Sequence, residues 1–127
     1  MELFGSYTSP YVRHCRIAFK ETGLAYSFTE TDHDMSAKLS PAKKVPFLHH
    51  NDLRFFDSSS ILKYVREKNG ERFFADTTDF DQYCLVNTAM DATINLFLLS
   101  KEGVTPENNG YMKRQHERVH EILALME

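Results

Sequence analysis

The stretch from Gly5 to Phe19 constrains the fold most, because it carries the signals of a strand end, a short loop and a helix start. Ser9 stands where an N-cap residue belongs, and Pro10 follows at the first helical position, where a missing N–H costs nothing. Apolar residues then recur at helical spacing, and Gly23 supplies the stop. Ser9 either only caps this helix or places a hydroxyl where free backbone N–H groups hold an anion.

Composition and charge exclude several classes of function. Hydrophobic residues make up 42% of the 127 residues, enough to bury a core. The formal net charge is -3, and the 15 basic and 18 acidic residues are well mixed, so no basic stripe indicates a nucleic-acid surface. The start lacks the regions of a secretory leader, and no apolar stretch approaches a membrane span. Cys15 and Cys84 lie far apart without a disulfide or zinc pattern, so we expect a cytoplasmic protein with no metal.

The first seventy residues predict a four-stranded mixed sheet with helices on it. A strand, a helix and a second strand form a βαβ unit, and a hairpin turning at Asn51-Asp52 and a further helix follow. Between residues 31 and 44 we expect a loop with one helical turn near Ser36 to Leu39. The predicted strands are residues 2–6, 25–30, 45–50 and 53–56, and the predicted helices are residues 10–22 and 57–70.

The remaining residues predict helices only. A linker at residues 71–78 leads to a long helix that begins at Thr78, and a second helix runs from about Asn109 to the end. The expected apolar stripes are Tyr83, Val86, Met90, Ile94 and Phe97 on the first helix, and Met112, His116, Val119, Leu123 and Met126 on the second. Two helices cannot cover both stripes, so we expect a second subunit or a longer protein.

Three motifs together resemble the glutathione S-transferase family, in its serine-type bacterial and plant forms. They are Thr8-Ser9-Pro10-Tyr11-Val12, Lys44-Val45-Pro46-Phe47-Leu48 and Asp57-Ser58. The resemblance implies a thioredoxin-like domain over residues 1–75 and the start of an all-helical domain over residues 78–127. It also implies a cis bond before Pro46 and glutathione contacts from Lys44, the Val45 backbone, Asp57 and Ser58.

The resemblance implies an enzyme in which Ser9 hydrogen-bonds the glutathione sulfur and favours its thiolate for attack on a soft electrophile. Glutathione is then the co-substrate, and a cytoplasmic homodimer active in detoxification is expected. Tyr7 is a rival hydroxyl for the sulfur. The chain departs from the family where His14 replaces a frequent arginine, with Arg13 beside it, and where Asp57 replaces a commoner glutamate.

Two other functions stay open. A glutathione-dependent thiol reductase would need a cysteine at position 9, and Ser9 speaks against it. A non-catalytic binding protein of the transcription or translation machinery is the other alternative. Among the remaining candidates, Cys15 is expected to be a buried thiol, and His49 and His50 lie on opposite faces of a strand, where they cannot easily share a metal.

Overall fold

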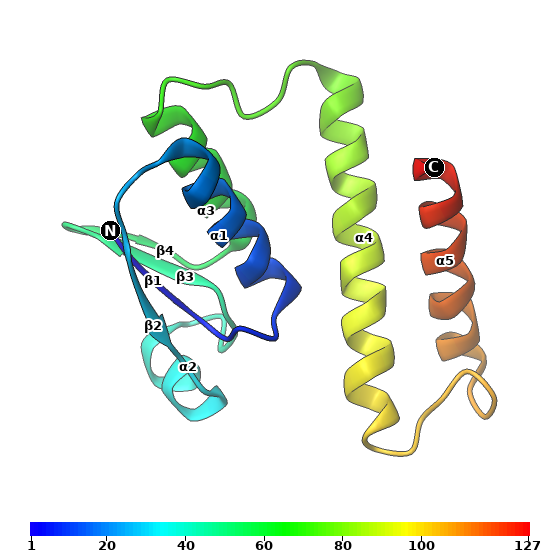
Figure 1. Cartoon of the computed structure of the whole chain (residues 1–127). Helices are drawn as coiled ribbons and strands as arrows, with labels where there is room; N and C mark the ends of the chain where they lie inside the picture. The colour runs from blue at the N-terminus through cyan, green and yellow to red at the C-terminus, as the bar shows by residue number, and fades with distance from the viewer. The chain divides into compact units, whose positions relative to one another are not determined.

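A four-stranded mixed sheet in the order β2-β1-β3-β4 organises the first part of the chain. The computed structural model describes all residues 1–127, which divide into two compact units, Met1–Phe73 and Phe74–Glu127. The strands are β1 Glu2–Gly5, β2 Ser27–Glu30, β3 Phe47–His50 and β4 Leu53–Phe55. β1 pairs in parallel with β2 and antiparallel with β3, and β3 pairs antiparallel with β4 (Figure 1). The expected sheet is confirmed.

Three helices accompany the sheet: α1 Pro10–Thr22, α2 His33–Leu39 and α3 Ser58–Lys68. α1 and α3 pack against each other. α2 follows β2 and lies away from α1 and α3 (Figure 1). Apolar residues of α1 and α3 form the core with residues of the two central strands. Its buried members include Leu3, Phe4, Val12, Cys15, Ala18, Phe19, Phe47, Leu48, Ile61, Leu62 and Val65.

Gly5 lets α1 approach the central strand closely. A Cβ atom at this position would lie 2.6 Å from each of the two methyl carbons of Val12. Both residues are buried, and Val12 lies in the first turn of α1. The absence of a side chain at Gly5 therefore sets the distance between β1 and the start of α1.

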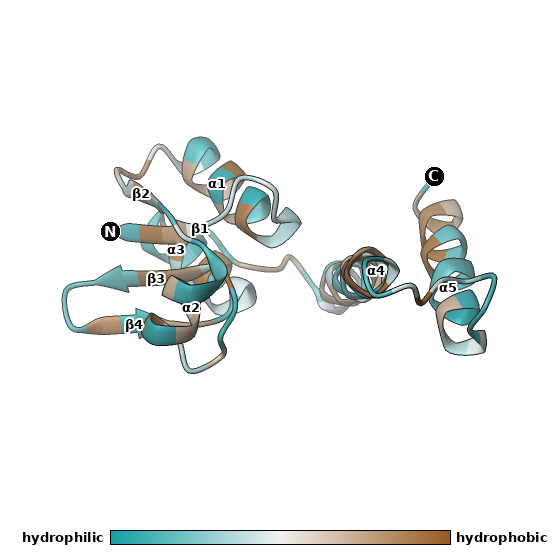
Figure 2. Cartoon of the chain, turned by 90° about the horizontal axis from the view of Figure 1, so that it is seen from below, coloured by the Kyte–Doolittle hydropathy of each residue, from teal (hydrophilic) through white to brown (hydrophobic).

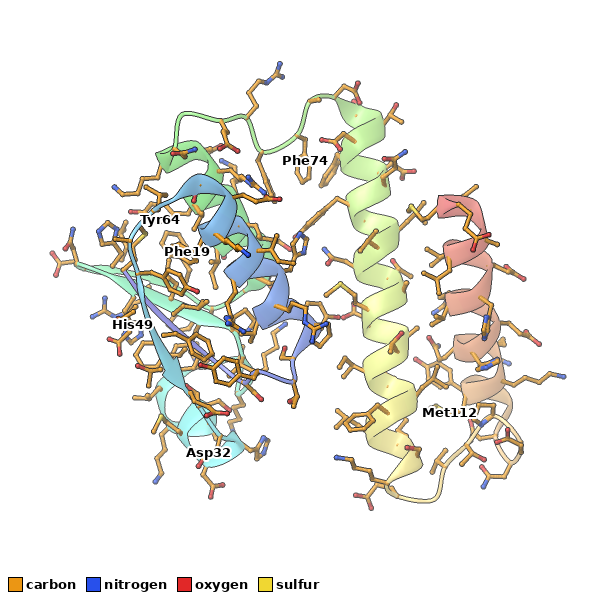
Figure 3. All side chains as sticks on the ribbon, in the orientation of Figure 1. Phe19, Asp32, His49, Tyr64, Phe74 and Met112 are labelled. Carbon is orange, nitrogen blue, oxygen red and sulfur yellow. The ribbon has the colours of Figure 1, made fainter.

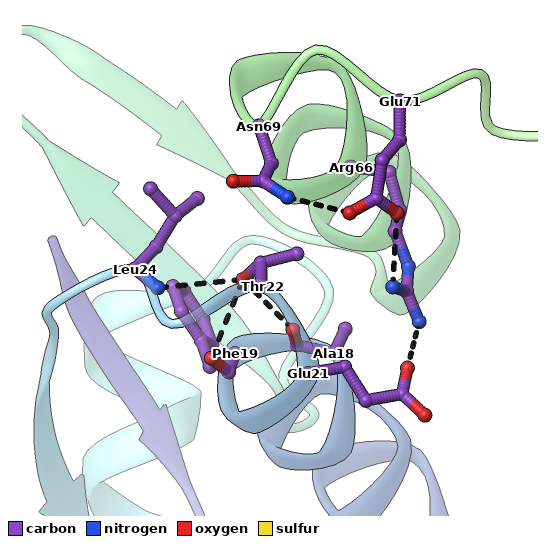
Figure 4. Close-up of polar contacts among 8 residues, drawn as sticks. All are labelled: Ala18, Phe19, Glu21, Thr22, Leu24, Arg66, Asn69 and Glu71. Carbon is purple, nitrogen blue, oxygen red and sulfur yellow. Dashed lines mark hydrogen bonds and ion pairs between the residues drawn. The ribbon is translucent and has the colours of Figure 1, made fainter.

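Arg66 joins the end of α3 to the end of α1 (Figure 4). Its guanidinium group forms an ion pair with Glu21 of α1 and donates a 3.0 Å hydrogen bond to Glu71. The side-chain amide of Asn69 donates to the other carboxylate oxygen of Glu71 at 2.5 Å. Gly23, with a φ of 69°, ends α1 in the left-handed conformation. These contacts fix the two helix ends side by side.

The segment after β2 is more regular than the sequence predicted. α2 begins at His33 rather than near Ser36, because the Asp32 side chain accepts a 2.7 Å hydrogen bond from the Met35 backbone N–H and caps the helix (Figure 3). Ser36 is buried, and its hydroxyl donates to the carbonyl of His33. The prediction of a loop with one helical turn near Ser36 to Leu39 was therefore wrong about the length of the helix, which has seven residues.

Some predicted boundaries also differ. β2 begins at Ser27 and β3 at Phe47, two residues later than expected in each case. Pro46 has no N–H for a ladder hydrogen bond, so a strand that starts after it is physically reasonable. The long helix begins at Thr77 instead of Thr78, because Asp76 is its N-cap and accepts from the N–H of Asp79 at 3.0 Å.

The second unit consists of two helices that pack against each other, α4 Thr77–Ser100 and α5 Gly110–Met126. In Figure 2, α4 carries hydrophobic residues on several sides, with polar residues among them. It buries Ala89 and Ala92, whereas Val86 and Phe97 of the predicted stripe are exposed. Those two alanines lie outside the predicted stripe. No helix of the chain is long and apolar enough to cross a membrane.

The predicted stripe of α5 was also partly wrong. α5 buries Met112, Gln115 and Ile122, and Met112 lies on the side of α4 (Figure 3). His116, Leu123 and Met126 are exposed. The buried residues step by three and seven, which is one face of a helix slightly rotated from the predicted one. Gln115 was missed because a polar residue was not expected on the buried face; its side-chain oxygen accepts from Arg118 at 2.9 Å.

Candidate functional site

The sheet topology brings all of the predicted site segments to one edge. β1 pairs in parallel with β2, and its Phe4 lies opposite Phe47 at the start of β3. The end of β1, the end of β2, the start of β3 and the end of β4 therefore share that edge. The loop with Ser9, the Val45-Pro46 segment and the Asp57-Ser58 pair follow or precede those strand ends directly.

Ser9 is the N-cap of α1. Its backbone is extended, with φ -76° and ψ 125°, and its Oγ accepts a 3.3 Å hydrogen bond from the Val12 N–H. The residue is half-buried. A hydroxyl oxygen that accepts this bond keeps its own hydrogen for another partner. Capping and donation to an anion are thus compatible roles for the same side chain.

Asp57 and Ser58 open α3 at the same edge. One oxygen of Asp57 accepts from the Ser59 N–H at 2.9 Å, and the other lies 3.4 Å from the Lys44 ammonium. Burial alone would raise the pKa of the Asp57 carboxyl, but the Ser59 N–H and the Lys44 charge outweigh it and hold that pKa below its usual value. The pair of Lys44 and Asp57 is exposed, so both charges are accessible to a ligand.

The Val45-Pro46 peptide bond is cis, the geometry that the resemblance implied for it. Val45 is half-buried and Pro46 is buried at the start of β3. Val45 itself lies before the first residue of the strand. A backbone segment at that place can pair with an extended peptide.

A contact between helices links the two helix starts. The Cys15 thiol, fully buried on α1, lies 3.9 Å from the carbonyl oxygen of Ser58, the first residue of α3. Burial raises the pKa of the Cys15 thiol to about 12, and the Asp57 carboxylate adds to the rise. The expected buried thiol is therefore confirmed, and Cys15 has none of the properties of a reactive cysteine.

Arg16 lies beside the candidate site and was not among the site residues predicted from the sequence. Its guanidinium carbon lies 4.7 Å from the ring centre of Tyr7 and 5.3 Å from that of Phe28. The Tyr7 and Phe28 rings are themselves 4.8 Å apart. This stack fixes the Tyr7 ring on β2, and half of Tyr7 remains exposed. The stack joins residues from a loop, a helix and a strand, so no local sequence pattern indicates it.

The two residues weighed as replacements for an arginine differ in environment. Arg13 is exposed, whereas His14 is half-buried on α1. Burial lowers the pKa of His14, the Arg66 charge lowers it further, and Glu21 opposes both. No group of three or more histidine, cysteine or carboxylate side chains is placed to hold a metal ion.

The βαβ unit, the hairpin and the final helix around a mixed sheet define a thioredoxin-like domain, which is followed by a helical unit. A family model described as "Glutathione S-transferase, N-terminal domain" matches residues 3–73. That match spans more than half of the chain, so the chain belongs to the glutathione S-transferase family.

Curated relatives cover mainly the first unit. Glutathione S-transferase U6 of Arabidopsis thaliana is 35% identical over 72 residues, which are 53% of this chain and 32% of that protein. The chain therefore spans about a third of the length of this relative. The uncharacterized GST-like protein YibF of Escherichia coli K12 is 26% identical over 138 residues, covering 100% of this chain and 68% of that protein.

Solved structures extend the likeness in fold to both units. A glutathione S-transferase from Methylobacillus flagellatus, solved with glutathione bound, covers 98% of this chain with a TM-score of 0.84 and 22% identity. The match takes in 67% of that chain. A second, from Methylobacterium radiotolerans and solved with glutathione sulfonate, has a TM-score of 0.79, 22% identity, and covers 97% of this chain and 63% of that one. At this identity they show the fold.

Proposed function

We propose that this protein binds glutathione at the described sheet edge and activates its thiol for transfer to a soft electrophile. The observation that carries the proposal is the convergence of three segments there: the Ser9 cap, the Val45-Pro46 strand start and the Asp57-Ser58 helix start. Two similar structures were solved with glutathione or its sulfonate bound, which supports this choice of ligand.

Each part of glutathione has a partner of suitable chemistry at this edge. The Val45 backbone pairs with the extended peptide, and Asp57 pairs with the γ-glutamyl ammonium. Ser58 and the N–H groups that open α3 take the adjacent carboxylate. Lys44 supplies a positive charge for a carboxylate of the ligand. The glutathione sulfur then lies at the start of α1, where Ser9 donates its hydroxyl hydrogen.

Ser9 and the N-terminus of α1 can supply the free energy needed to ionise the glutathione thiol at neutral pH. A free thiol has a pKa near 8.5, so ionisation at neutral pH requires a fall of roughly two units, or about 2.7 kcal/mol. The helix N-terminus contributes on the order of 0.3–1 kcal/mol, and a hydroxyl donating to an anion contributes about 1.5–3 kcal/mol. Near the middle of their ranges the two together reach this value, and neither alone does so comfortably. The thiolate attacks the electrophile, and a carbon–sulfur bond forms as the leaving group departs.

The proposal extends to a cytoplasmic homodimer with a role in detoxification. Exposed large apolar side chains on the second unit support an association of subunits; they include Phe97, Leu98, Tyr111, Leu123 and Leu125. Light scattering of the purified chain tests this directly, and a well-dispersed monomer that binds no hydrophobic dye would contradict the dimer.

The test of glutathione binding is a calorimetric titration of the wild-type protein, Asp57→Ala and Asp52→Ala. Asp52 is an exposed residue of the hairpin turn and serves as the control. Loss of a hydrogen bond to a charged group should weaken binding by about 1.5–3 kcal/mol in Asp57→Ala only. Equal affinity in all three proteins would remove Asp57 from the site. Binding without any conjugation of an aryl halide would favour a non-catalytic binding protein.

A further inference from the structure

Two histidines of α5 face each other on the exposed surface of the second unit. His116 and His120 are four residues apart, and their Nε2 atoms are 3.2 Å apart. The ring centres are 4.4 Å apart in an edge-to-face arrangement. Both residues are exposed, so neither ring is needed for the packing of α5.

We propose that His116 and His120 form a two-histidine site for a divalent transition-metal ion of the zinc, nickel or copper type. Two nitrogens that bind one ion at about 2.0–2.1 Å lie roughly 2.9 Å apart at a right angle and roughly 3.3 Å apart at the tetrahedral angle. The observed separation of 3.2 Å lies between these values. The pair is therefore already spaced for chelation by both rings.

Ring orientation does not oppose chelation. Without an ion, the 3.2 Å contact requires one Nε2 to carry a hydrogen and the other to accept it. An ion takes the place of that hydrogen once the first ring shifts its proton to Nδ1, which changes neither ring's charge. Both rings are exposed, so small rotations that make the lone pairs converge displace no packed neighbour.

The surroundings suit a cation bound by two protein ligands and water. Glu117 and Glu121 each follow one of the two histidines in sequence, and Ala124 adds little bulk one turn beyond His120. No third protein ligand completes the site, which leaves the other positions to water.

The other histidines do not offer such a pair. The chain has six, of which His49 and His50 are adjacent on β3, where successive side chains point to opposite faces. His14 is half-buried on α1, and His33 is exposed at the start of α2. His33 is therefore a matched control for a single exposed histidine on a helix.

The test is a calorimetric titration of the whole chain with nickel chloride and zinc chloride in a buffer that does not chelate metals. Wild type should bind one ion, and magnesium should not bind, because imidazole prefers transition metals. His116→Ala and His120→Ala should each weaken binding by at least about tenfold, the lower limit of the loss seen when only an outer partner of a metal ligand is removed. His33→Ala should bind as wild type does.

A spacing variant separates chelation from the mere presence of two histidines. His120→Ala combined with Glu121→His keeps the number of histidines but places the second ring about 140° around the helix from His116, so this variant should bind as weakly as His120→Ala. Circular dichroism and the thermal midpoint without metal check that each variant folds; with nickel, the midpoint should rise in wild type and His33→Ala but not in the variants that lack His116 or His120. Wild-type affinity in the spacing variant or in either single variant, or no binding by wild type, would overturn the proposal.

Discussion

The Cys15 thiol on α1 lies 3.9 Å from the carbonyl oxygen of Ser58 on α3, and this contact joins the second turn of α1 to the start of α3. The same burial that allows the contact raises the pKa of Cys15 to about 12. The other cysteine, Cys84, is exposed on α4.

The first prediction concerns thiol reactivity. At pH 8, a disulfide reagent should modify one thiol per native chain, that of Cys84, because Cys15 is buried and protonated. After denaturation the count should rise to two. Cys84→Ser should abolish the native reaction, whereas Cys15→Ala should leave it unchanged. Rapid modification of the native Cys84→Ser variant would show that Cys15 is accessible.

The second prediction concerns the approach of α1 to β1. Gly5→Ala should lower the free energy of unfolding by about 1–3 kcal/mol, the usual cost of forcing an extra carbon into a packed core. The reason is the 2.6 Å separation between the added Cβ and the methyl carbons of Val12. Urea denaturation measures the effect.

Gly110→Ala is the control for this variant, because its added Cβ would lie 4.0 Å from the nearest side-chain atom, at the open start of α5. It should be neutral or slightly stabilising. Val12→Ala should cost less in the Gly5→Ala background than in wild type, because it removes the clashing methyl groups. Additive effects of the two substitutions would argue against the clash.

The third prediction concerns the Asp57 cap. Because the pKa of Asp57 is lower in the folded chain than its ordinary value of 3.8, its ionisation stabilises the fold above that value, and this contribution is lost as pH falls through the folded pKa. Asp57→Asn keeps an oxygen that accepts from Ser59 but cannot ionise. Between pH 5 and pH 2 its stability should therefore fall less than that of wild type.

Lys44→Met tests the contribution of the ion pair to the same titration. It leaves the Ser59 hydrogen bond in place and removes the nearest positive charge. Its fall in stability with acid should lie between those of wild type and Asp57→Asn. Denaturant titrations at each pH provide the values, and identical pH profiles for wild type and Asp57→Asn would contradict the lowered pKa.

The fourth prediction concerns Ser9 and rests on the proposed function. Ser9→Ala removes both the cap and the donated hydrogen bond, whereas Ser9→Gly removes the hydroxyl with a loss of only a few tenths of a kcal/mol in capping. Both variants should bind glutathione within a few-fold of wild type. In both, the bound thiol should titrate at higher pH, and conjugation at neutral pH should fall.

The measurement is the ultraviolet absorbance of the bound thiolate as a function of pH, with Tyr7→Phe as the comparison. Ser9→Cys should instead replace conjugation by thiol–disulfide exchange, in which the introduced thiolate attacks a glutathione disulfide, forms a mixed disulfide and releases one glutathione thiolate. A shift in Tyr7→Phe alone would assign the role to the tyrosine. No thiolate in any of the proteins would favour the non-catalytic alternative.

Local signals predicted most of the first unit. Ser9 was expected as a cap and accepts the backbone hydrogen bond of a cap, as does Asp57 at the start of the next predicted helix. Turn residues at Asn51-Asp52 placed the hairpin correctly. These features depend on a few neighbouring residues, which is why the sequence alone was sufficient. The cap at Asp32 obeys the same rule and was missed because no clear apolar periodicity follows it.

The faces of α4 and α5 could not be predicted in the same way. Apolar and polar residues are interspersed around all sides of α4, so hydrophobic periodicity does not select a face; Ala89 and Ala92 are buried where small side chains let helices approach. The stack of Arg16 on Tyr7 and Phe28 joins three segments of the chain and has no local signature. The pairing of Lys44 with Asp57 likewise depends on the sheet topology.

The ion pair between Lys44 and Asp57 has a consequence for any ligand that carries an ammonium group to this edge. The oxygen of Asp57 that faces Lys44 carries no backbone hydrogen bond, so an incoming cation competes with Lys44 for it. Binding is then an exchange of one cation for another, in which the number of ion pairs at Asp57 stays the same. Lys44 is released at that moment and becomes available to an anionic group of the same ligand, so a zwitterion gains more here than a simple amine does.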